Sequence, residues 1–409
     1  MPRSKPKPEN PISSAVTEWY KNNTSELSAP GATADNLAAE APKRWVIYEP
    51  MVLLPSGSFN SPTLRETLAA VSQDCRGSLW TIILRKIGEK TREKATHLAV
   101  NDGIPLTVAA RSGAGDVSGE EEENILRSPI GLRILHGDFG PPETKGKTVS
   151  DEDFAQALWA STKQNGIHQT WAPRWTMFSR GNVKEKARLL TFHDPQLGGR
   201  HQFPRRVRPR TALSKTWAVD LYGGIGYFVF SYAKLGMRVL CWELNPWSVE
   251  GLRRGARANG WSVKVIKGED LTRPTTELVS EEDTIVVFLE NNREATRRVR
   301  ELRAYEFDLQ VLHVNCGLLP RSDDSWEASR EILGGSEGGW LHLHENVGVK
   351  DIEPRKGEIQ LIFDTMNKRG GDGWVAKVEH VELVKTFAPD VWHCVFDVYI
   401  TKSISNATS

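Results

Sequence analysis

The spacing of hydrophobic positions in residues 216–261 predicts a strand, a helix and a second strand. Residues 217–221 form a short apolar run interrupted by one acid, which is typical of a buried parallel strand. A helical pattern covers residues 227–235, and Gly236 should end it, because glycine readily adopts positive φ. Residues 237–242 are apolar again and predict the second strand. We therefore expect a β-α-β unit around which the rest of the chain is organised.

Glycines and acids stand at the ends of these two predicted strands. The first strand ends in Asp220 and is followed by Gly223 and Gly226, and the second is followed by Glu243. Ligands of α/β folds bind at the carboxyl ends of the strands, where glycines let the backbone approach them. A carboxylate after the second strand can accept both hydroxyls of a ribose. The unit thus predicts a nucleoside site with Asp220 and the glycines as its floor.

The spacing of the glycines narrows the class of nucleoside site. It differs from the dinucleotide pattern G-x-G-x-x-G, and the absence of a following phosphate-binding lysine excludes a P-loop. The arrangement resembles the S-adenosylmethionine (SAM) site of class I methyltransferase-like enzymes. We therefore predict an α/β fold, with a class I SAM-dependent methyltransferase-like (Rossmann-like) domain over residues 151–400.

The rest of the chain has a different pattern. Residues 1–42 are rich in Pro, Ser, Asn, Ala and Lys, which predicts a disordered tail. Short apolar runs in residues 43–150 predict a small N-terminal α+β accessory domain. Within this domain, residues 111–123 contain mainly Gly, Ser and acids and are expected to form a surface loop. Residues 401–409 should be a frayed tail.

Composition restricts the location and the partners. The formal net charge of +1 does not indicate a generally basic protein, so an RNA partner would require a local basic patch. No apolar run is long enough for a transmembrane helix, and the first residues lack a secretory signal. The four cysteines are scattered, which predicts neither a disulfide framework nor a metal site. We expect a cytoplasmic protein without a membrane partner.

One short segment before the glycine turn is strongly basic, and its arginines are Arg205, Arg206, Arg208 and Arg210. The segment is either a solvated loop or a contact for nucleic-acid phosphates, since Arg and Lys near a nucleic-acid backbone release counterions and supply affinity. We expect it to lie beside the SAM edge of the sheet, which favours the phosphate contact.

Two histidines, His342 and His344, stand at strand spacing next to Glu345. This spacing places both side chains on one face of a strand, as two metal ligands would be. No third ligand follows nearby, so we expect no metal and a packed or hydrogen-bonding role. Proton transfer by one of the two histidines remains an alternative, and no residue of the sequence is identified as a general base.

Two segments compete for the third strand and for recognition of adenine. Residues 262–267 alternate between apolar and polar positions and end in Gly268-Glu-Asp270. Residues 283–289 read DTIVVFL and end in Glu290-Asn-Asn292. Either polar ending can supply acceptors to the adenine amino group. The residues alone leave this choice open.

Several motifs occur in a fixed order along residues 171–400. They are WAPRWTMFSRGNVKEKAR, VDLYGGIGYF, CWELNPWSVEGLRR, HVNCGLLPRS and LHLHENV. Together they resemble the tRNA wybutosine-synthesizing protein 2 family. The resemblance implies transfer of the 3-amino-3-carboxypropyl group of SAM to carbon 7 of 4-demethylwyosine, next to the anticodon of tRNA-Phe. It also implies a monomeric enzyme.

The resemblance assigns roles to several residues. Ser179 and Lys186 would contact the methionine end or the ribose of SAM, and Lys186 could pair with the methionine carboxylate. The family pattern Asp-Asn-Arg matches Asn291-Asn292-Arg293 except for its first residue, which favours the second candidate for adenine recognition. Asn291 replaces the acid of the pattern, so its bond to adenine would lack charge assistance.

The loop after the predicted strand of residues 308–315 bears on which group of SAM is transferred. Amino-group methyltransferases often carry Asn-Pro-Pro-aromatic there, whereas this chain has Asn315-Cys-Gly-Leu-Leu-Pro320. This difference argues against amine methylation and agrees with a carbon nucleophile, with Asn315 as a candidate substrate contact. A tRNA guanine methyltransferase is the nearest alternative. A SAM-fold module that only binds RNA is a second alternative.

Overall fold

The computed structural model describes residues 9–27, 32–101, 107–111, 117–123, 131–144, 148–196, 206–305, 307–371 and 373–402. The chain divides into two compact units, one of residues 1–162 and 171–178 and the other of residues 163–170 and 179–409. It passes from one to the other within the paired strands β7 (Ala160–Gln164) and β8 (Ile167–Trp171). Across the described ranges, no helix is both long and apolar enough to cross a membrane.

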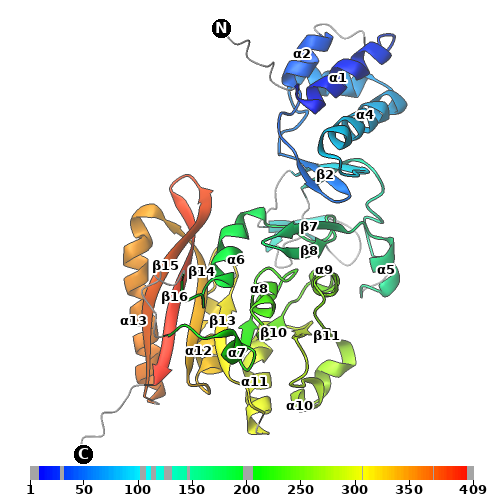
Figure 1. Ribbon diagram of the computed structural model, residues 1–409. Coiled ribbons are helices and arrows are strands. Elements are labelled where there is room, and N and C mark those ends of the chain that lie inside the picture. The colour runs from blue at the N-terminus through cyan, green and yellow to red at the C-terminus, as the bar shows by residue number, and fades with distance from the viewer. Residues whose placement is uncertain are drawn as a thin grey trace, which may run out of the picture. The chain divides into compact units, whose positions relative to one another are not determined.

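The first unit combines helices with a four-stranded sheet of order β1-β2-β3-β6 (Figure 1). The strands are β1 (Val46–Tyr48), β2 (Met51–Leu54), β3 (His97–Asn101) and β6 (Leu132–His136). The helices are α1 (Pro11–Asn22), α2 (Ala34–Glu40), α3 (Pro62–Ala70), α4 (Gln73–Thr91) and α5 (Asp151–Gln156).

Helix α1 corrects the prediction that residues 1–42 form a disordered tail. The Asn10 side chain caps the helix by accepting from the backbone N–H groups of Ile12 and Ser13, and Pro11 occupies its first position. Its apolar face is buried, and Trp19 Nε1 donates to the Cys75 carbonyl at 2.8 Å. The prediction was wrong because the polar composition of the segment hides an apolar residue at every third or fourth position.

The prediction of a surface loop over residues 111–123 was also wrong for its described part. Strand β4 (Thr107–Arg111) pairs antiparallel with β5 (Val117–Glu123), and Thr107 lies opposite Glu123. The run of glutamates was taken as typical of a loop, although edge strands accept charged residues as well.

The second unit is built on an eight-stranded sheet of order β11-β12-β10-β9-β13-β14-β16-β15. The parallel strands are β9 (Trp217–Asp220), β10 (Arg238–Trp242), β11 (Val263–Ile266), β12 (Ile285–Phe288), β13 (Val311–Cys316) and β14 (Gly338–Gly348). Two long antiparallel strands, β15 (Trp374–Ala388) and β16 (Val391–Lys402), close the sheet.

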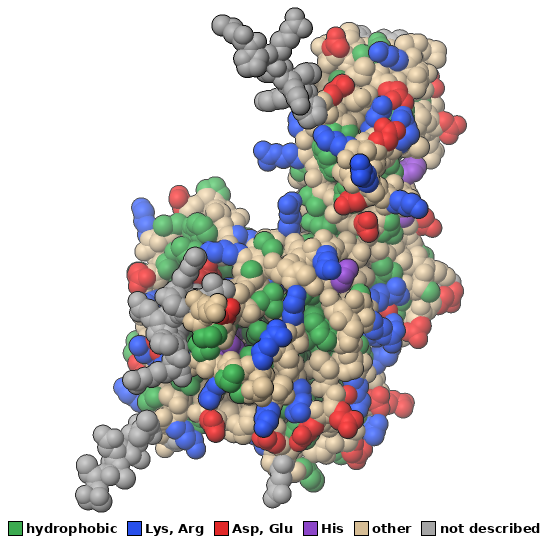
Figure 2. Space-filling model, in the orientation of Figure 1, with side chains coloured by type: hydrophobic (Ala, Val, Ile, Leu, Met, Phe, Trp, Pro, Cys, Tyr) green, Lys and Arg blue, Asp and Glu red, His purple; other side chains and the backbone are tan. Residues whose placement is uncertain are grey.

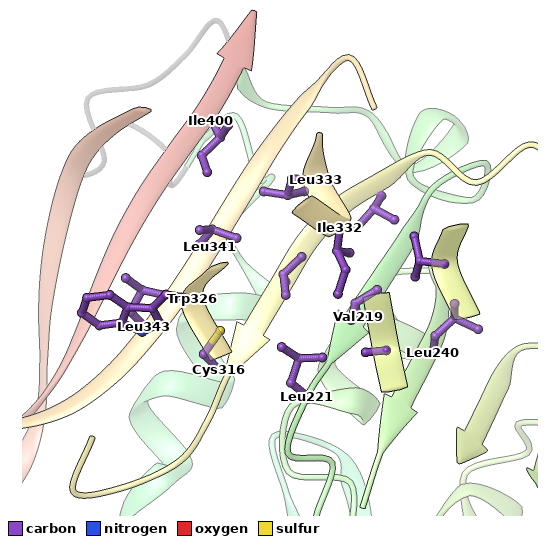
Figure 3. Packing of buried hydrophobic residues seen from close by; sticks show 14 of the residues in the cluster. Val219, Leu221, Leu240, Cys316, Trp326, Ile332, Leu333, Leu341, Leu343 and Ile400 are labelled. Carbon is purple, nitrogen blue, oxygen red and sulfur yellow. The ribbon is translucent and has the colours of Figure 1, made fainter. Parts of the chain in front are cut away.

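Helices bury both faces of this sheet. The cluster on one face includes residues of α6 (Val183–Leu190), α7 (Arg210–Leu213), α8 (Val229–Lys234) and α9 (Pro246–Ala258). The other cluster includes residues of α10 (Thr275–Leu278), α11 (Ala295–Ala304), α12 (Trp326–Leu333) and α13 (Ile352–Gly370). In Figure 3, Trp326, Ile332 and Leu333 of α12 lie over the strands. Because alternate strand residues serve the two layers, the central strand β12 is apolar and buried throughout.

The predicted β-α-β unit is confirmed as β9, α8 and β10, and the class I methyltransferase-like fold is confirmed with it. Gly236 has a φ of +91° after α8, as its place at the end of the helix requires. Both candidates for the third strand are strands. β12 pairs directly with β10, whereas β11 pairs with the outer side of β12 at the edge of the sheet.

Candidate functional site

The polar residues singled out in the sequence meet at the carboxyl ends of the parallel strands. Asp220 ends β9, Glu243 follows β10, and Asn315 lies near the end of β13. In the sheet register, Asp220 stands opposite Cys241 on one neighbouring strand and opposite Asn315 on the other. The site thus lies at the edge where α/β folds bind ligands.

Backbone N–H groups on two sides of Glu243 hold its carboxylate in place. Oε2 accepts from the Gly224 N–H at 2.8 Å, and Oε1 accepts from the Asn245 N–H at 2.8 Å. Burial raises the pKa of this carboxyl, and these backbone hydrogen bonds oppose the rise. Each carboxylate oxygen keeps acceptor capacity beyond one N–H. Glu243 can therefore accept from a diol.

The glycine turn packs closely against helix α8 and against Glu243. Gly226 has a φ of +89°, and a Cβ there would lie 2.5 Å from the Phe230 ring, so only glycine fits. Gly223 has less need of glycine, because its Cβ would approach its neighbours only to 3.4 Å. Sequence reasoning did not single out Gly224, whose N–H binds Glu243.

Asp220 forms the buried floor of the site. Its Oδ1 accepts from the Tyr222 N–H at 3.1 Å and from Asn315 Nδ2 at 3.2 Å. Oδ2 has no hydrogen-bond partner among the described residues. Burial raises the pKa of Asp220 to about 7. A carboxyl group with one free oxygen and a pKa near neutrality is a suitable partner for a ligand cation or for a proton.

Asn315 lies deeper than a substrate contact should. Its side chain is fully buried, where Nδ2 donates to Asp220 and Oδ1 accepts from His344 Nε2 at 3.2 Å. A contact between Asn315 and the substrate stays a prediction. Asn315 supports Asp220 from below.

Ser179 and Lys186 approach the glycine turn through Tyr227. The Ser179 N–H donates to the Tyr227 hydroxyl at 2.9 Å, and the Lys186 ammonium lies 5.7 Å from the centre of the Tyr227 ring. Lys186 also donates to the side-chain oxygens of Gln164 and Gln169, both at 2.6 Å. Burial lowers the pKa of Lys186 to about 7. Tyr227, which sequence reasoning missed, joins the two motifs.

The segment after β12 supplies the opposite end of the site. Asn292 Nδ2 donates to the Leu221 carbonyl at 2.9 Å, which ties the segment to the end of β9. Asn291 is exposed, and its Oδ1 accepts from the Arg293 N–H. Glu290 forms an ion pair with the buried Arg298. The competing segment, Gly268–Thr272, follows the outer strand β11, further along the sheet.

The basic segment lies at the amino ends of the parallel strands, whereas the predicted SAM site lies at their carboxyl ends. Its predicted place beside the SAM site was therefore wrong. Arg205 is outside the described residues. The Arg206 guanidinium lies 3.9 Å from the centre of the Tyr399 ring and pairs with Glu379. Arg208 approaches Glu337, which precedes β14, at 3.9 Å. These partners mark the amino ends of the parallel strands.

The remaining arginine, Arg210, is exposed at the start of α7, which comes before β9 in the chain. On the face drawn in Figure 2, Lys and Arg side chains are mixed with Asp and Glu. The sequence could not locate the basic segment, because its partners are more than 120 residues away along the chain.

We therefore expect Arg206→Ala to destabilise the fold rather than to weaken RNA binding. Losing the partly buried pair with Glu379 and the stacking on Tyr399 should lower the free energy of unfolding by about 1–3 kcal/mol. Urea unfolding measures this loss, with the exposed Arg210→Ala as the control. The salt dependence of tRNA binding should stay unchanged in Arg206→Ala, and a flatter dependence would contradict this placement.

His342 and His344 point to one face of β14, but each has its own partners. His342 Nδ1 lies 2.7 Å from Asp397 Oδ1, and its Nε2 lies 2.9 Å from His313 Nδ1. His344 Nδ1 lies 2.9 Å from His393 Nε2. Within the described part of the chain, no group of three or more His, Cys, Asp or Glu side chains is arranged to hold a metal ion.

Known proteins were compared with the whole chain. No protein-family model matches it. It is 37% identical over 360 residues to tRNA wybutosine-synthesizing protein 2 of Schizosaccharomyces pombe, which covers 87% of this chain and 72% of the relative. The protein of the same name from Saccharomyces cerevisiae is 31% identical over 432 residues, which cover 96% of this chain and 81% of that relative.

A solved structure, TYW2 of Pyrococcus horikoshii in complex with MeSAdo, matches with a TM-score of 0.54 at 17% identity. The match covers 96% of this chain and 100% of that one, and it shows a shared fold. The two fungal relatives carry the stronger relationship, and they confirm the family that the motifs predicted. This chain belongs to the tRNA wybutosine-synthesizing protein 2 family.

Proposed function

We propose that this enzyme transfers the 3-amino-3-carboxypropyl group of SAM to carbon 7 of 4-demethylwyosine in tRNA-Phe. It would do so as a monomer in the cytoplasm, in the pathway that makes wybutosine. The observation that carries the proposal is the set of Glu243, Asp220 and the glycine turn at the carboxyl edge, in a chain 37% identical to a wybutosine-synthesizing protein.

The bonds that change in this reaction are few. Carbon 7 of the base attacks the methionine Cγ next to the sulfonium, and the Cγ–S bond breaks with its electron pair passing to sulfur. The products are alkylated tRNA, neutral methylthioadenosine and the proton lost from carbon 7. Because SAM itself is the activated reactant, orientation of its three S–C bonds is the main contribution that the protein can make.

The proposed cofactor contacts follow the order of groups in SAM. Glu243 would accept from the ribose hydroxyls, and Asn291 with Asn292 would contact the adenine. Ser179 and Lys186 would lie toward the methionine end, on either side of Tyr227. The glycine turn, with Gly223 and Gly226, would pass under the ligand. The structure supports this order, because Asn292 is tied to the end of β9 and Ser179 to the helix side of the turn.

The nearest alternative is methyl transfer to a guanine at the same nucleotide. An enzyme that methylates an exocyclic amine presents acceptors after the fourth strand of this fold. Here the Asn315 side chain is buried and committed to Asp220 and His344, so it is not available to hold an amine. This observation favours transfer of the aminocarboxypropyl group.

The position of the label distinguishes the two reactions. SAM labelled at its carboxyl carbon should label hypomodified tRNA-Phe, and methyl-labelled SAM should not. The sulfur product should be methylthioadenosine rather than S-adenosylhomocysteine. Label arriving only from the methyl group would refute the aminocarboxypropyl assignment. Boiled enzyme and tRNA-Phe lacking the tricyclic base serve as controls.

A further inference from the structure

A lysine of the closing hairpin reaches the motif that precedes the glycine turn. Lys385, on β15, places its Nζ 3.2 Å from the Ser179 hydroxyl, although 206 residues separate the two in sequence. Its neighbour Lys184 pairs with Glu382 at 2.7 Å, whereas Lys385 has no carboxylate within ion-pair distance among the described residues. Burial lowers the pKa of Lys385. An anion beside the Lys385 ammonium would offset the free-energy cost of burying its charge.

The backbone of the motif is shaped around this lysine. A Cβ on Gly181 would lie 2.3 Å from Lys385 Cδ and 2.8 Å from its Nζ. Gly181 has no positive φ, so packing against Lys385 is the reason that a larger residue does not fit. Residues 179–182 therefore restrict the path of the Lys385 side chain, and its ammonium ends beside the Ser179 hydroxyl.

A continuous set of contacts connects this ammonium to the ribose end of the site. The Ser179 N–H donates to the Tyr227 hydroxyl, and the Tyr227 ring covers Gly224, where a Cβ would lie 3.1 Å from the ring. The Gly224 N–H in turn binds Glu243. The glycine turn thus has a carboxylate at one end and an ammonium with a hydroxyl at the other.

SAM has the complementary order of groups, with a ribose diol at one end and an α-carboxylate at the other. We propose that Lys385 and the Ser179 hydroxyl bind the α-carboxylate of the methionine moiety. Lys385 would take this role in place of Lys186, whose ammonium donates to Gln164 and Gln169. This rests on the proposed function only in placing SAM at the carboxyl edge. A carboxylate held at Lys385 fixes the far end of the chain to be transferred, while Glu243 fixes the nucleoside.

A phosphate of the tRNA backbone is the other anion that a lysine could bind. Three features favour the carboxylate. The site has one half-buried ammonium rather than several exposed ones. This ammonium already donates a hydrogen bond to the Ser179 hydroxyl. Tyr227 connects Ser179 to the glycine turn. Phosphate contacts that supply tRNA affinity are exposed and numerous.

Two nucleosides that differ in the carboxylate test the proposal. S-adenosylhomocysteine carries the amino-acid chain, and methylthioadenosine lacks it. By calorimetry, Lys385→Met should bind S-adenosylhomocysteine about 10- to 100-fold more weakly than wild type, as expected for a lost charged hydrogen bond. Its affinity for methylthioadenosine should change less than about twofold. The matched control, Lys184→Met, should leave both affinities unchanged.

Three results would overturn the proposal. One is unchanged affinity for S-adenosylhomocysteine in a folded variant. Another is an equal loss for both nucleosides, which would make Lys385 a structural residue. The third is unchanged nucleoside binding with weaker, less salt-dependent tRNA binding, which would make it a phosphate contact. Lys385→Gln, which keeps a polar end, replaces the Met variant if that fails to fold. The labelling experiment on wild type tests the proposed reaction separately.

Discussion

Glu243→Ala should weaken the binding of SAM by about 10- to 100-fold. The substitution removes the proposed acceptor of the ribose hydroxyls, and a lost hydrogen bond to a charged group costs roughly 1.5–3 kcal/mol. It also deprives the Gly224 and Asn245 N–H groups of their acceptor. The glycine turn should therefore loosen as well, so we expect the loss to be near the upper end of this range. Calorimetry with SAM measures it.

Two further variants show whether the loss is specific. Glu243→Gln retains one acceptor oxygen and most of the shape, and it should bind SAM more tightly than the Ala variant. Glu269→Ala removes an exposed acid after the outer strand β11, in the competing segment for adenine, and it should have no effect. A folded Glu243→Ala protein with wild-type affinity would mean that the cofactor binds elsewhere.

The sequence was sufficient for the centre of the second unit because local rules determine it. Strands buried on both faces must be continuously apolar, and Gly226 must be glycine because Phe230 occupies the space of a side chain. The same reasoning located Asp220 and Glu243 at one edge, because parallel strands bring their carboxyl ends together. The choice between the segments after β12 and β11 for adenine recognition needed the family pattern, because both segments follow strands of the same sheet.

The errors concern features that tertiary packing decides. Helix α1 has apolar residues at helical spacing, but what they pack against, as Trp19 does at Cys75 of α4, is decided by the tertiary fold. Arg206 looks like a free cation until Tyr399 and Glu379, far away in sequence, are placed beside it. Lys385 carried no signal at all, because its meaning depends on the pairing of a distant hairpin with Ser179. Composition and spacing contain no information on such pairs.

Buried histidines connect several strands and loops of the second unit. One chain runs from His193 through His313 and His342 to Asp397, with ring nitrogens 2.8 and 2.9 Å apart and a 2.7 Å contact to the carboxylate. The other joins His393 to His344, which contacts Asn315. All five rings are at least nine-tenths buried. A neutral ring can donate from one nitrogen and accept at the other, so His313, which lies between two rings, fits the chain in its neutral form.

This network should make the fold sensitive to mild acid. Burial lowers the pKa of His193 to about 4 and those of His344 and His393 to about 3, whereas an unfolded histidine titrates near 6.5. The unfolded chain then binds more protons than the folded one below pH 6.5, so the free energy of unfolding falls as the pH falls. Each of the three should contribute a loss of about 1.3 kcal/mol between pH 7 and 5.5.

Asp220 acts in the opposite direction over the same interval. Its pKa of about 7 in the folded state means that the folded chain takes up a proton first, which offsets about 1.5 kcal/mol. These four groups together give a net loss of about 2–3 kcal/mol between pH 7 and 5.5. Burial also lowers the pKa of His313, which adds to the loss. Urea unfolding followed by tryptophan fluorescence measures it.

Replacing one ring isolates its share of this loss. His344→Gln should lower stability at pH 7, because Gln cannot bridge His393 and Asn315 as the ring does. The same variant should lose about 1.3 kcal/mol less than wild type on going to pH 5.5, because the unfolded chain has one fewer histidine to protonate. An identical pH dependence in His344→Gln and wild type would show that His344 titrates alike in the folded and unfolded chains, and would remove the histidine network as the source of acid sensitivity.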